Sequence, residues 1–434
     1  MDAPLITNTE EPKIPAQSAG EQRLAAKYQQ VRDFSVHCCQ PLTVEDFGLQ
    51  AIVETSPPKW HLAHTTWFFE TFVLKVFCKN YRCFDSHFEV LFNSYYNGIG
   101  LQHPRAQRGL LSRPSLDTVH HYRQTIDNEI RQLLNQVDHA HYQDICARIV
   151  LGMHHERQHQ ELFFTDLKYC WYQNPILPVY CETALSAGRE QRLGWQHYSG
   201  GICDIGHKEQ DFCFDNELPH HQIVLTPFAL TDRLSTNGDF LQFIQEGGYQ
   251  NPEWWLADGW HEVLQQQWRA PLYWQQRDGQ WFEYTLHGLQ PLDLNRPVVH
   301  VSAYEADAFA RWCGARLPTE QELELALVDA AATHGGCVGQ FVDSGEYHPG
   351  NCDGQSQLFG SAWQWTSSAY GPYPGFQPAA GALGEYNGKF MCNQWVLRGG
   401  SCVTSRDHIR SSYRNFFYPR DRWQFSGIRL AKTL

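Results

Sequence analysis

The chain has 434 residues, which is enough for two or three domains that each bury a core. Its formal net charge of −13 argues against a surface for nucleic acid or an anionic membrane. No apolar run approaches the roughly 20 residues that a membrane span needs, and the N-terminal stretch lacks the apolar core of a signal peptide. We therefore expect a cytoplasmic protein with no nucleic-acid or membrane partner, which begins with a disordered lead-in over residues 1–20.

The first half of the chain, residues 21–175, is predicted to be helical. Apolar residues recur at helical spacing, and the prolines fall between the helices rather than inside them. Ser115 is placed to cap the helix that follows it. We predict a bundle of four main helices and one short helix, with bounds at about 21–39, 45–53 (the short one), 59–75, 116–133 and 145–169.

The longest predicted helix carries two histidines one turn apart, His155 and His159. Residues four apart share a face of a helix, so the two imidazoles form a possible pair of metal ligands. Read as H-E-x-x-H, the motif is that of a zinc hydrolase with Glu156 as general base. Read as H-x3-H-x-E, it gives weight to Glu161 and takes its third ligand from elsewhere. His61 or His64 could supply that ligand, and this spacing alone leaves the choice open.

An arginine cluster follows in the same half of the chain. Arg105 and Arg108 stand close together in an acidic protein, which makes them candidates for holding a carboxylate. The alternative is a solvated basic turn. The 14 cysteines are scattered without any C-x-x-C pair, which predicts free thiols rather than disulfides or a zinc ribbon.

The amino-acid composition changes after a proline-containing linker at residues 176–192. Gly, Trp, Asp and Pro become frequent over residues 193–434, and helical periodicity fades. This pattern predicts an irregular α+β domain. Only two helices are expected there, at 237–246 and 302–314, and strands are expected at about 222–225, 298–301 and 396–398.

Several motifs of this second half resemble the sulfatase-modifying-factor fold, that of the formylglycine-generating enzyme, which is C-type-lectin-like. The matching pieces are the stretch 296–320, Trp363-Gln-Trp-Thr-Ser, Val396-Leu-Arg-Gly-Gly-Ser and Phe425-Ser-Gly-Ile-Arg. The oxidase members of that family bind copper through two cysteines after the R-G-G-S element. Cys402 stands too early and has no partner, so the resemblance implies the fold but not that chemistry.

The first half resembles the DinB-like metal-binding bundle. A DinB-like bundle followed by a sulfatase-modifying-factor domain is the layout of the ergothioneine sulfoxide synthases, and Ser56-Pro-Pro-Lys-Trp-His-Leu-Ala-His64 and 384–393 match that family as well. The resemblance implies a non-haem Fe(II) held by His64, His155 and His159. It implies that hercynine and a thiol, cysteine or γ-glutamylcysteine, are joined with O2 to a sulfoxide.

The resemblance also implies roles for other residues. One type in the family places a catalytic tyrosine pair in the bundle, which maps onto Tyr95 and Tyr96, and we expect Tyr96 to act first. The actinobacterial type carries its tyrosine before R-G-G-S instead, and residues 382–385 hold none. Asn415, together with Gln158, is expected to meet the hercynine carboxylate.

Phe416 is expected to face the trimethylammonium group of hercynine. Arg105 and Arg108 match an R-x-x-R element and are expected to hold the carboxylate of the thiol substrate. The family's Asp and Arg for the γ-glutamyl group are missing beyond Asn415, which favours free cysteine. Glu161 stays a possible substrate contact or a minor candidate ligand.

Three other functions compete with this hypothesis. A selenoneine synthase of the same fold would join hercynine to a selenosugar. A zinc hydrolase of the H-E-x-x-H type would need no O2. A binding module without catalysis would have no need of a three-histidine set beside two tyrosines.

Overall fold

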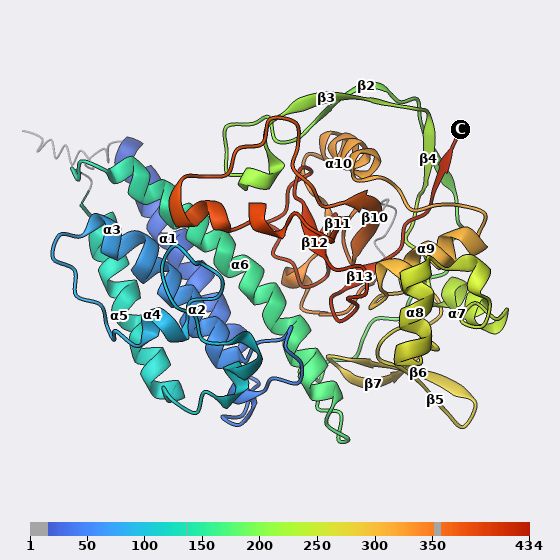
Figure 1. Cartoon of the computed structure of the whole chain (residues 1–434), viewed down its shortest axis with the longest axis horizontal. Helices are drawn as coiled ribbons and strands as arrows, with labels where there is room; N and C mark the ends of the chain where they lie inside the picture. Colours follow the sequence, from blue (N-terminus) through green and yellow to red (C-terminus); the bar gives the residue numbers. More distant parts are fainter. Residues whose placement is uncertain (1–15, 137, 351–356) are drawn as a thin grey trace, which may run out of the picture.

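The computed structural model describes residues 16–136, 138–350 and 357–434. Figure 1 shows a helical half and a mixed half side by side, with the longest helix running between them. The fold predicted from the sequence, a DinB-like bundle followed by an α+β domain, is confirmed. The lead-in expected at 1–20 lies largely outside the described residues, and the first helix already begins at Ala16.

Four main helices build the first half, as predicted. The second of them continues as a π-helical turn, Glu70–Leu74, into α3, so the stretch predicted at 59–75 forms one rod. Ser115 caps α5, since its side chain accepts the Thr118 N–H at 3.2 Å. The short helix predicted at 45–53 is wrong: only a 3-10 turn, Asp46–Gly48, forms there. The helices are α1 (Ala16–Cys38), α2 (Pro58–Phe69), α3 (Lys75–Phe77), α4 (Phe88–Leu91), α5 (Leu116–Leu134) and α6 (Tyr142–Tyr172).

Small sheets joined by loops make up the second half. In the described residues, its helices are α7 (Asn237–Gln245), α8 (Ala257–Gln266), α9 (Ala303–Trp312) and α10 (Glu320–His334). Its strands are β1 (Trp195–Tyr198), β2 (Gly201–Ile205), β3 (His221–Leu225), β4 (Phe228–Thr231), β5 (Trp274–Arg277), β6 (Gln280–Thr285), β7 (Gly288–Pro291), β8 (Gly339–Gln340), β9 (Phe359–Gly360), β10 (Trp363–Ala369), β11 (Trp395–Arg398), β12 (Asn415–Phe417), β13 (Ser426–Gly427) and β14 (Ala431–Thr433).

The sheet β12-β11-β10-β13 lies nearest to the bundle side of this domain, and its antiparallel register pairs Val396 with Phe416 (Figure 1). Two helices, α8 and α10, were not predicted, although α7 and α9 were. The strand predicted at 298–301 is wrong as well, since Val299 forms only an isolated bridge with Gly427. These four buried residues pack as core without joining a ladder.

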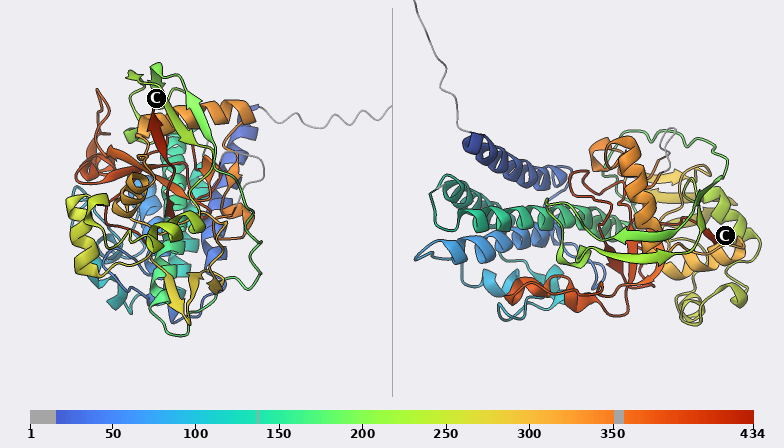
Figure 2. Two further views of the ribbon diagram at one scale, coloured as in Figure 1. Left: turned by 90° about the vertical axis from the view of Figure 1, so that its right-hand side faces the viewer. Right: turned by 90° about the horizontal axis from the view of Figure 1, so that it is seen from above.

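The two halves share one continuous hydrophobic core. Aromatic pairs cross between them, such as Phe164 against Tyr347 at 4.9 Å and Tyr172 against Tyr273 at 5.0 Å between ring centroids. Both bundle residues of these pairs belong to α6, which runs along the boundary between the halves in Figure 1, and the view from above shows the bundle and the second domain side by side (Figure 2). The helix that carries the histidine pair is therefore held from both sides, and a site on it can draw on residues of both domains.

No helix among the described residues is long and apolar enough to cross a membrane. All described cysteines are free thiols, as the sequence predicted.

Candidate metal centre and substrate pocket

Three histidines meet where α2 crosses α6. His155 and His159 project from α6 one turn apart, and of the two histidines of α2 it is His64, not His61, whose ring nitrogen converges with theirs. Their candidate ligand atoms all lie within 4.8 Å of one another, and Nε2 of His64 is 3.2 Å from Nε2 of His155. Two nitrogens that bond one ion at about 2.1 Å and near a right angle lie about 3 Å apart. The geometry therefore fits a metal ion.

The imidazoles of this centre are held neutral by burial. His64 and His155 are buried, and desolvation lowers the pKa of His155 to about 3. Burial, together with the neighbouring His155, also brings the pKa of His64 and of His159 well below the ordinary value. A neutral imidazole keeps a lone pair for a metal, so the donor set suits Fe(II), Zn(II), Cu(II) or Ni(II).

Glu156 rules out the zinc-hydrolase interpretation of the motif. Its carboxylate is fully buried on the far side of α6, where it forms ion pairs with Arg32 at 2.7 Å and with Arg123. Ser35 donates a further hydrogen bond to it at 2.5 Å. These cations hold the pKa of Glu156 at about 2 against the effect of burial. A carboxylate so fully engaged cannot serve as a general base at the histidine centre.

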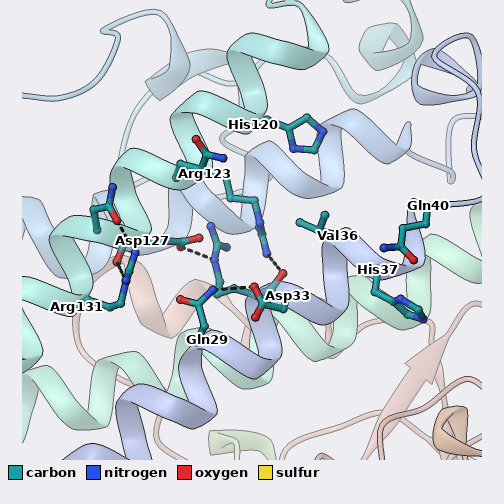
Figure 3. A pocket seen from close by; sticks show the side chains of 12 residues that line it. Gln29, Asp33, Val36, His37, Gln40, His120, Arg123, Asp127 and Arg131 are labelled. Carbon is teal, nitrogen blue, oxygen red and sulfur yellow. Dashed lines mark hydrogen bonds and ion pairs between the residues drawn. The ribbon is translucent and has the colours of Figure 1, made fainter.

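The residues around Glu156 also border a separate pocket of about 800 Å³ between α1 and α5. Figure 3 shows it as a polar groove in which Arg123, Asp127 and Arg131 already bond to their neighbours. The buried charges at its base are therefore already paired within the bundle. A second group of potential ligands, His207, Glu209 and Asp211, is mostly exposed, and exposed acidic groups are common without an ion.

The three-histidine centre opens into a pocket of about 270 Å³ between the two halves. The bundle contributes the histidine face, and the second domain contributes β12 and the loops before β11 and β13. Of the residues predicted from the sequence, the pocket is lined by Tyr95, Arg105, Arg108, His155, Gln158, His159, Glu161, Asn415 and Phe416.

Arg108 is the cation of this pocket. Its side chain is buried and stacks on the Trp60 ring at 3.5 Å. It donates to the hydroxyls of Ser56 and Ser94 at 2.8 and 3.0 Å, and its Nε has no partner. Within the described residues no carboxylate lies within ion-pair distance of it. Burial lowers the pKa of Arg108, because the guanidinium has lost water without gaining an anion.

The other arginine, Arg105, is exposed at the rim and donates to the Glu54 carbonyl at 2.5 Å. Across the pocket lies Asp421, whose pKa burial raises to about 7. The pocket thus offers a cationic group and a carboxylate, which is the complement of an amino acid zwitterion.

Glu161 is tied to the second domain rather than to the metal centre. Its carboxylate accepts hydrogen bonds from the Trp363 indole, from Ser401 at 2.9 Å and from Thr404 at 2.7 Å. It is not among the three residues whose ligand atoms converge. Glu161 therefore joins α6 to the R-G-G-S segment, and that is the contact the structure gives it.

The two predicted tyrosines differ in their placement. Tyr95 lines the pocket, whereas Tyr96 is fully buried behind it, with ring centroids 4.7 Å apart. The Tyr96 hydroxyl has no hydrogen-bond partner, and its ring packs against Trp67 at 5.7 Å and Phe72 at 4.9 Å. Which of the two acts stays a prediction.

Sequence reasoning missed two further tyrosines of the pocket. The Tyr386 hydroxyl donates to Oε1 of Gln158, and Nε2 of Gln158 donates to the Tyr413 hydroxyl at 2.6 Å. The Tyr386 ring also lies 5.6 Å from that of His155. Tyr386 stands one position after the segment 382–385, which holds no tyrosine, and belongs to the segment 384–393 that matches the family.

Fold and site together define a two-domain protein in which a DinB-like bundle carries three histidines that could hold a metal ion. Residues 27–163 match the DinB superfamily, and 197–350 and 330–434 match the sulfatase-modifying factor enzyme 1-like domain. The hercynine oxygenase of Mycolicibacterium smegmatis is 31% identical over 69% of this chain and 74% of its own length. That of Mycolicibacterium thermoresistibile is 30% identical over 76% and 78%.

The ergothioneine biosynthesis protein 1 of Schizosaccharomyces pombe is 29% identical over 51% of this chain and 28% of its own length. The chain belongs to the hercynine oxygenase family, the EgtB-type sulfoxide synthases of ergothioneine biosynthesis.

Proposed function

We propose that the protein is a non-haem Fe(II)- and O2-dependent enzyme that joins the sulfur of free cysteine to the imidazole of hercynine as a sulfoxide. The observation that carries the proposal is the pocket itself. Three neutral imidazoles form one wall of it, and a buried guanidinium without an anion stands in another. His64, His155 and His159 would hold the iron, which when bound supplies the activation of O2 and of the thiol.

Arg108 would bind the carboxylate of cysteine and regain the ion pair that the free protein lacks. Asp421 would face the ammonium group, and Arg105 would strengthen the field at the rim. A γ-glutamyl group would place a second carboxylate and its chain in a pocket of about 270 Å³. Free cysteine, with hercynine beside it, is the better fit.

Gln158 would position hercynine, because Tyr386 and Tyr413 fix the orientation of its amide. Phe416, stacked on Tyr370 at 4.0 Å, offers a ring face to the trimethylammonium group. Tyr95 or Tyr96 would donate a proton to the oxygen atom of O2 that is reduced to water while the other oxygen goes to the sulfur. Burial keeps both phenols protonated, since it raises the pKa of each well above the ordinary value.

The test is oxygen uptake by the Fe(II)-loaded protein, with hercynine plus cysteine and with hercynine plus γ-glutamylcysteine, with the products identified by mass. We expect uptake that needs both hercynine and cysteine, and a product with the mass of the joined sulfoxide. The zinc-loaded protein and a His155→Ala variant serve as controls and should be inactive. An iron-loaded protein that consumes no O2 with either thiol would overturn the proposal, and turnover with a selenosugar would replace it.

A further inference from the structure

Two further side chains, one on α2 and one on α6, lie next to the three histidines and take no part in the proposed reaction. His61 lies on α2, one turn before His64, and Asp166 lies on α6, two turns after His159. Nδ1 of His61 is 2.9 Å from Nδ1 of His159, and Nε2 of His61 is 3.2 Å from Oδ2 of Asp166. All of this is enclosed, since His61 and Asp166 are 5% and 3% exposed.

The chemistry of these contacts fixes where each proton sits. An ionised carboxylate only accepts hydrogen bonds, so His61 must carry its proton on Nε2 to donate to Asp166. Its Nδ1 is then a lone pair, which accepts a hydrogen bond from Nδ1–H of His159. His159 is left with a lone pair on Nε2, the nitrogen free to bind a metal. The chain of contacts therefore selects one tautomer of His159.

His64, the neighbouring candidate ligand, is held in the same tautomer by one direct hydrogen bond. Nδ1 of His64 donates to the Phe92 carbonyl at 2.6 Å, which leaves its Nε2 for the metal. The Ser56 backbone N–H donates to Oδ2 of Asp166 at 2.8 Å and anchors the carboxylate. His159 has no backbone carbonyl in this role, and His61 takes its place.

We propose that His61 and Asp166 are positioning residues that hold His159 in the metal-binding tautomer and fix the plane of its ring. The inference rests on the proposed function, because it presumes a metal at the three histidines. Loss of such an outer partner of a ligating histidine typically costs about 10- to 100-fold in metal affinity. His61 has no role in the reaction itself, so metal affinity is the quantity that measures its effect directly.

The experiment measures Co(II) binding by the full chain, through competition with a chelator and through the visible absorption of the bound ion. His61→Leu removes the acceptor for His159. His61→Asn restores it, because the amide oxygen can take the place of Nδ1. We expect affinity to fall about 10- to 100-fold in His61→Leu, with an altered Co(II) spectrum, and to return to within about threefold in His61→Asn.

A second pair of variants, at Asp166, tests the other end of the hydrogen-bond chain and replaces the first pair if His61→Leu fails to fold. In Asp166→Asn the amide oxygen can still accept from both Ser56 and His61, so we expect near-normal affinity. In Asp166→Ala, His61 loses the acceptor that sets its tautomer, and affinity should drop. Circular dichroism confirms that each variant is folded.

Unchanged Co(II) affinity and spectrum in folded His61→Leu and Asp166→Ala would overturn the inference. So would a loss in His61→Asn as large as that in His61→Leu, since it would mean that ring packing matters and the accepted proton does not. The outcome is separable from that of the proposed function. If the wild-type protein binds no metal, the proposed metal centre is wrong. If it binds metal but forms no sulfoxide, the proposed reaction is wrong and this inference still holds.

Discussion

Replacing Arg108 by methionine should weaken thiol binding without destabilising the free protein. The guanidinium is 3% exposed, has hydroxyl partners only, and keeps an unpartnered Nε. A buried charge without a counter-ion costs stability, and a methionine of similar length can keep the packing against Trp60. We therefore expect the free energy of unfolding to be unchanged or to rise by about 1 kcal/mol.

The effect on the substrate should be large and selective. Removing one partner of a buried charge pair costs about 2–5 kcal/mol, which corresponds to a rise of roughly 30-fold or more in the KM for cysteine. The KM for hercynine should change by less than about threefold. Arg108→Lys is the matched control, because it keeps the charge but loses the forked geometry of the guanidinium. Its KM for cysteine should lie between that of wild type and that of Arg108→Met.

Steady-state kinetics with each substrate varied in turn, together with thermal unfolding of the free protein, decides the matter. If Arg108→Met unfolds about 2 kcal/mol more easily while the KM for cysteine stays as it is, Arg108 is a structural residue that ties Ser56 to Ser94. The reasoning from its missing anion would then be refuted.

Four further predictions concern the walls of the pocket. Replacing the acting tyrosine of the pair, by Tyr96→Phe or Tyr95→Phe, should shift the product from sulfoxide towards cysteine sulfinate, which product ratios by mass spectrometry test. Tyr386→Phe should raise the KM for hercynine, which initial rates at varied hercynine concentration test. Glu161→Ala should lower the free energy of unfolding by about 1–3 kcal/mol, since it removes the acceptor of the buried Trp363 indole and of the Ser401 and Thr404 hydroxyls, which calorimetry measures. Because burial raises the pKa of Asp421 to about 7, above its value in the unfolded chain, the stability contributed by the protonated carboxyl is complete below the unfolded pKa and is lost progressively as pH rises through 7. Asp421→Asn should therefore stabilise the protein more at pH 8 than at pH 5, which thermal unfolding at the two pH values measures. The same substitution should abolish the tighter binding of L-serine, a competitor of cysteine, that wild type should show above pH 7.

Helical spacing brought His155 and His159 together because it is local, whereas His64 followed from the family resemblance. His155 and His159 share a face of α6 whatever surrounds the helix, and the proline-initiated start of α2 places His64 within it. What spacing could not decide was the role of Glu156, since H-E-x-x-H is the same string in both interpretations. Its burial between Arg32 and Arg123 depends on contacts with α1 and α5 that lie up to 124 residues away in the chain.

Other misses have equally specific causes. Helix α10 begins with a capping box, Thr319 and Glu322, which was present in the sequence and could have revealed it. Tyr386 was missed because the irregular turn at Gly381–Glu385 sets its register, and no periodicity describes such a turn. The strand expected at 298–301 is apolar because it is core, and an apolar run does not distinguish a ladder from packed loop.

The two halves contribute different parts of the site, and this accounts for the second domain. All three histidines of the centre come from the bundle, so the bundle alone could bind the ion, but the pocket beside them would then be open to water. The second domain closes the other side with Tyr386, Tyr413 and β12, and Glu161 reaches across to hold it there. A charge such as that of Arg108 acts more strongly in a site from which water is excluded. The same closure sets the space that remains beside the three histidines, and so β12 and the loops of the second domain limit the size of the molecule that can reach them.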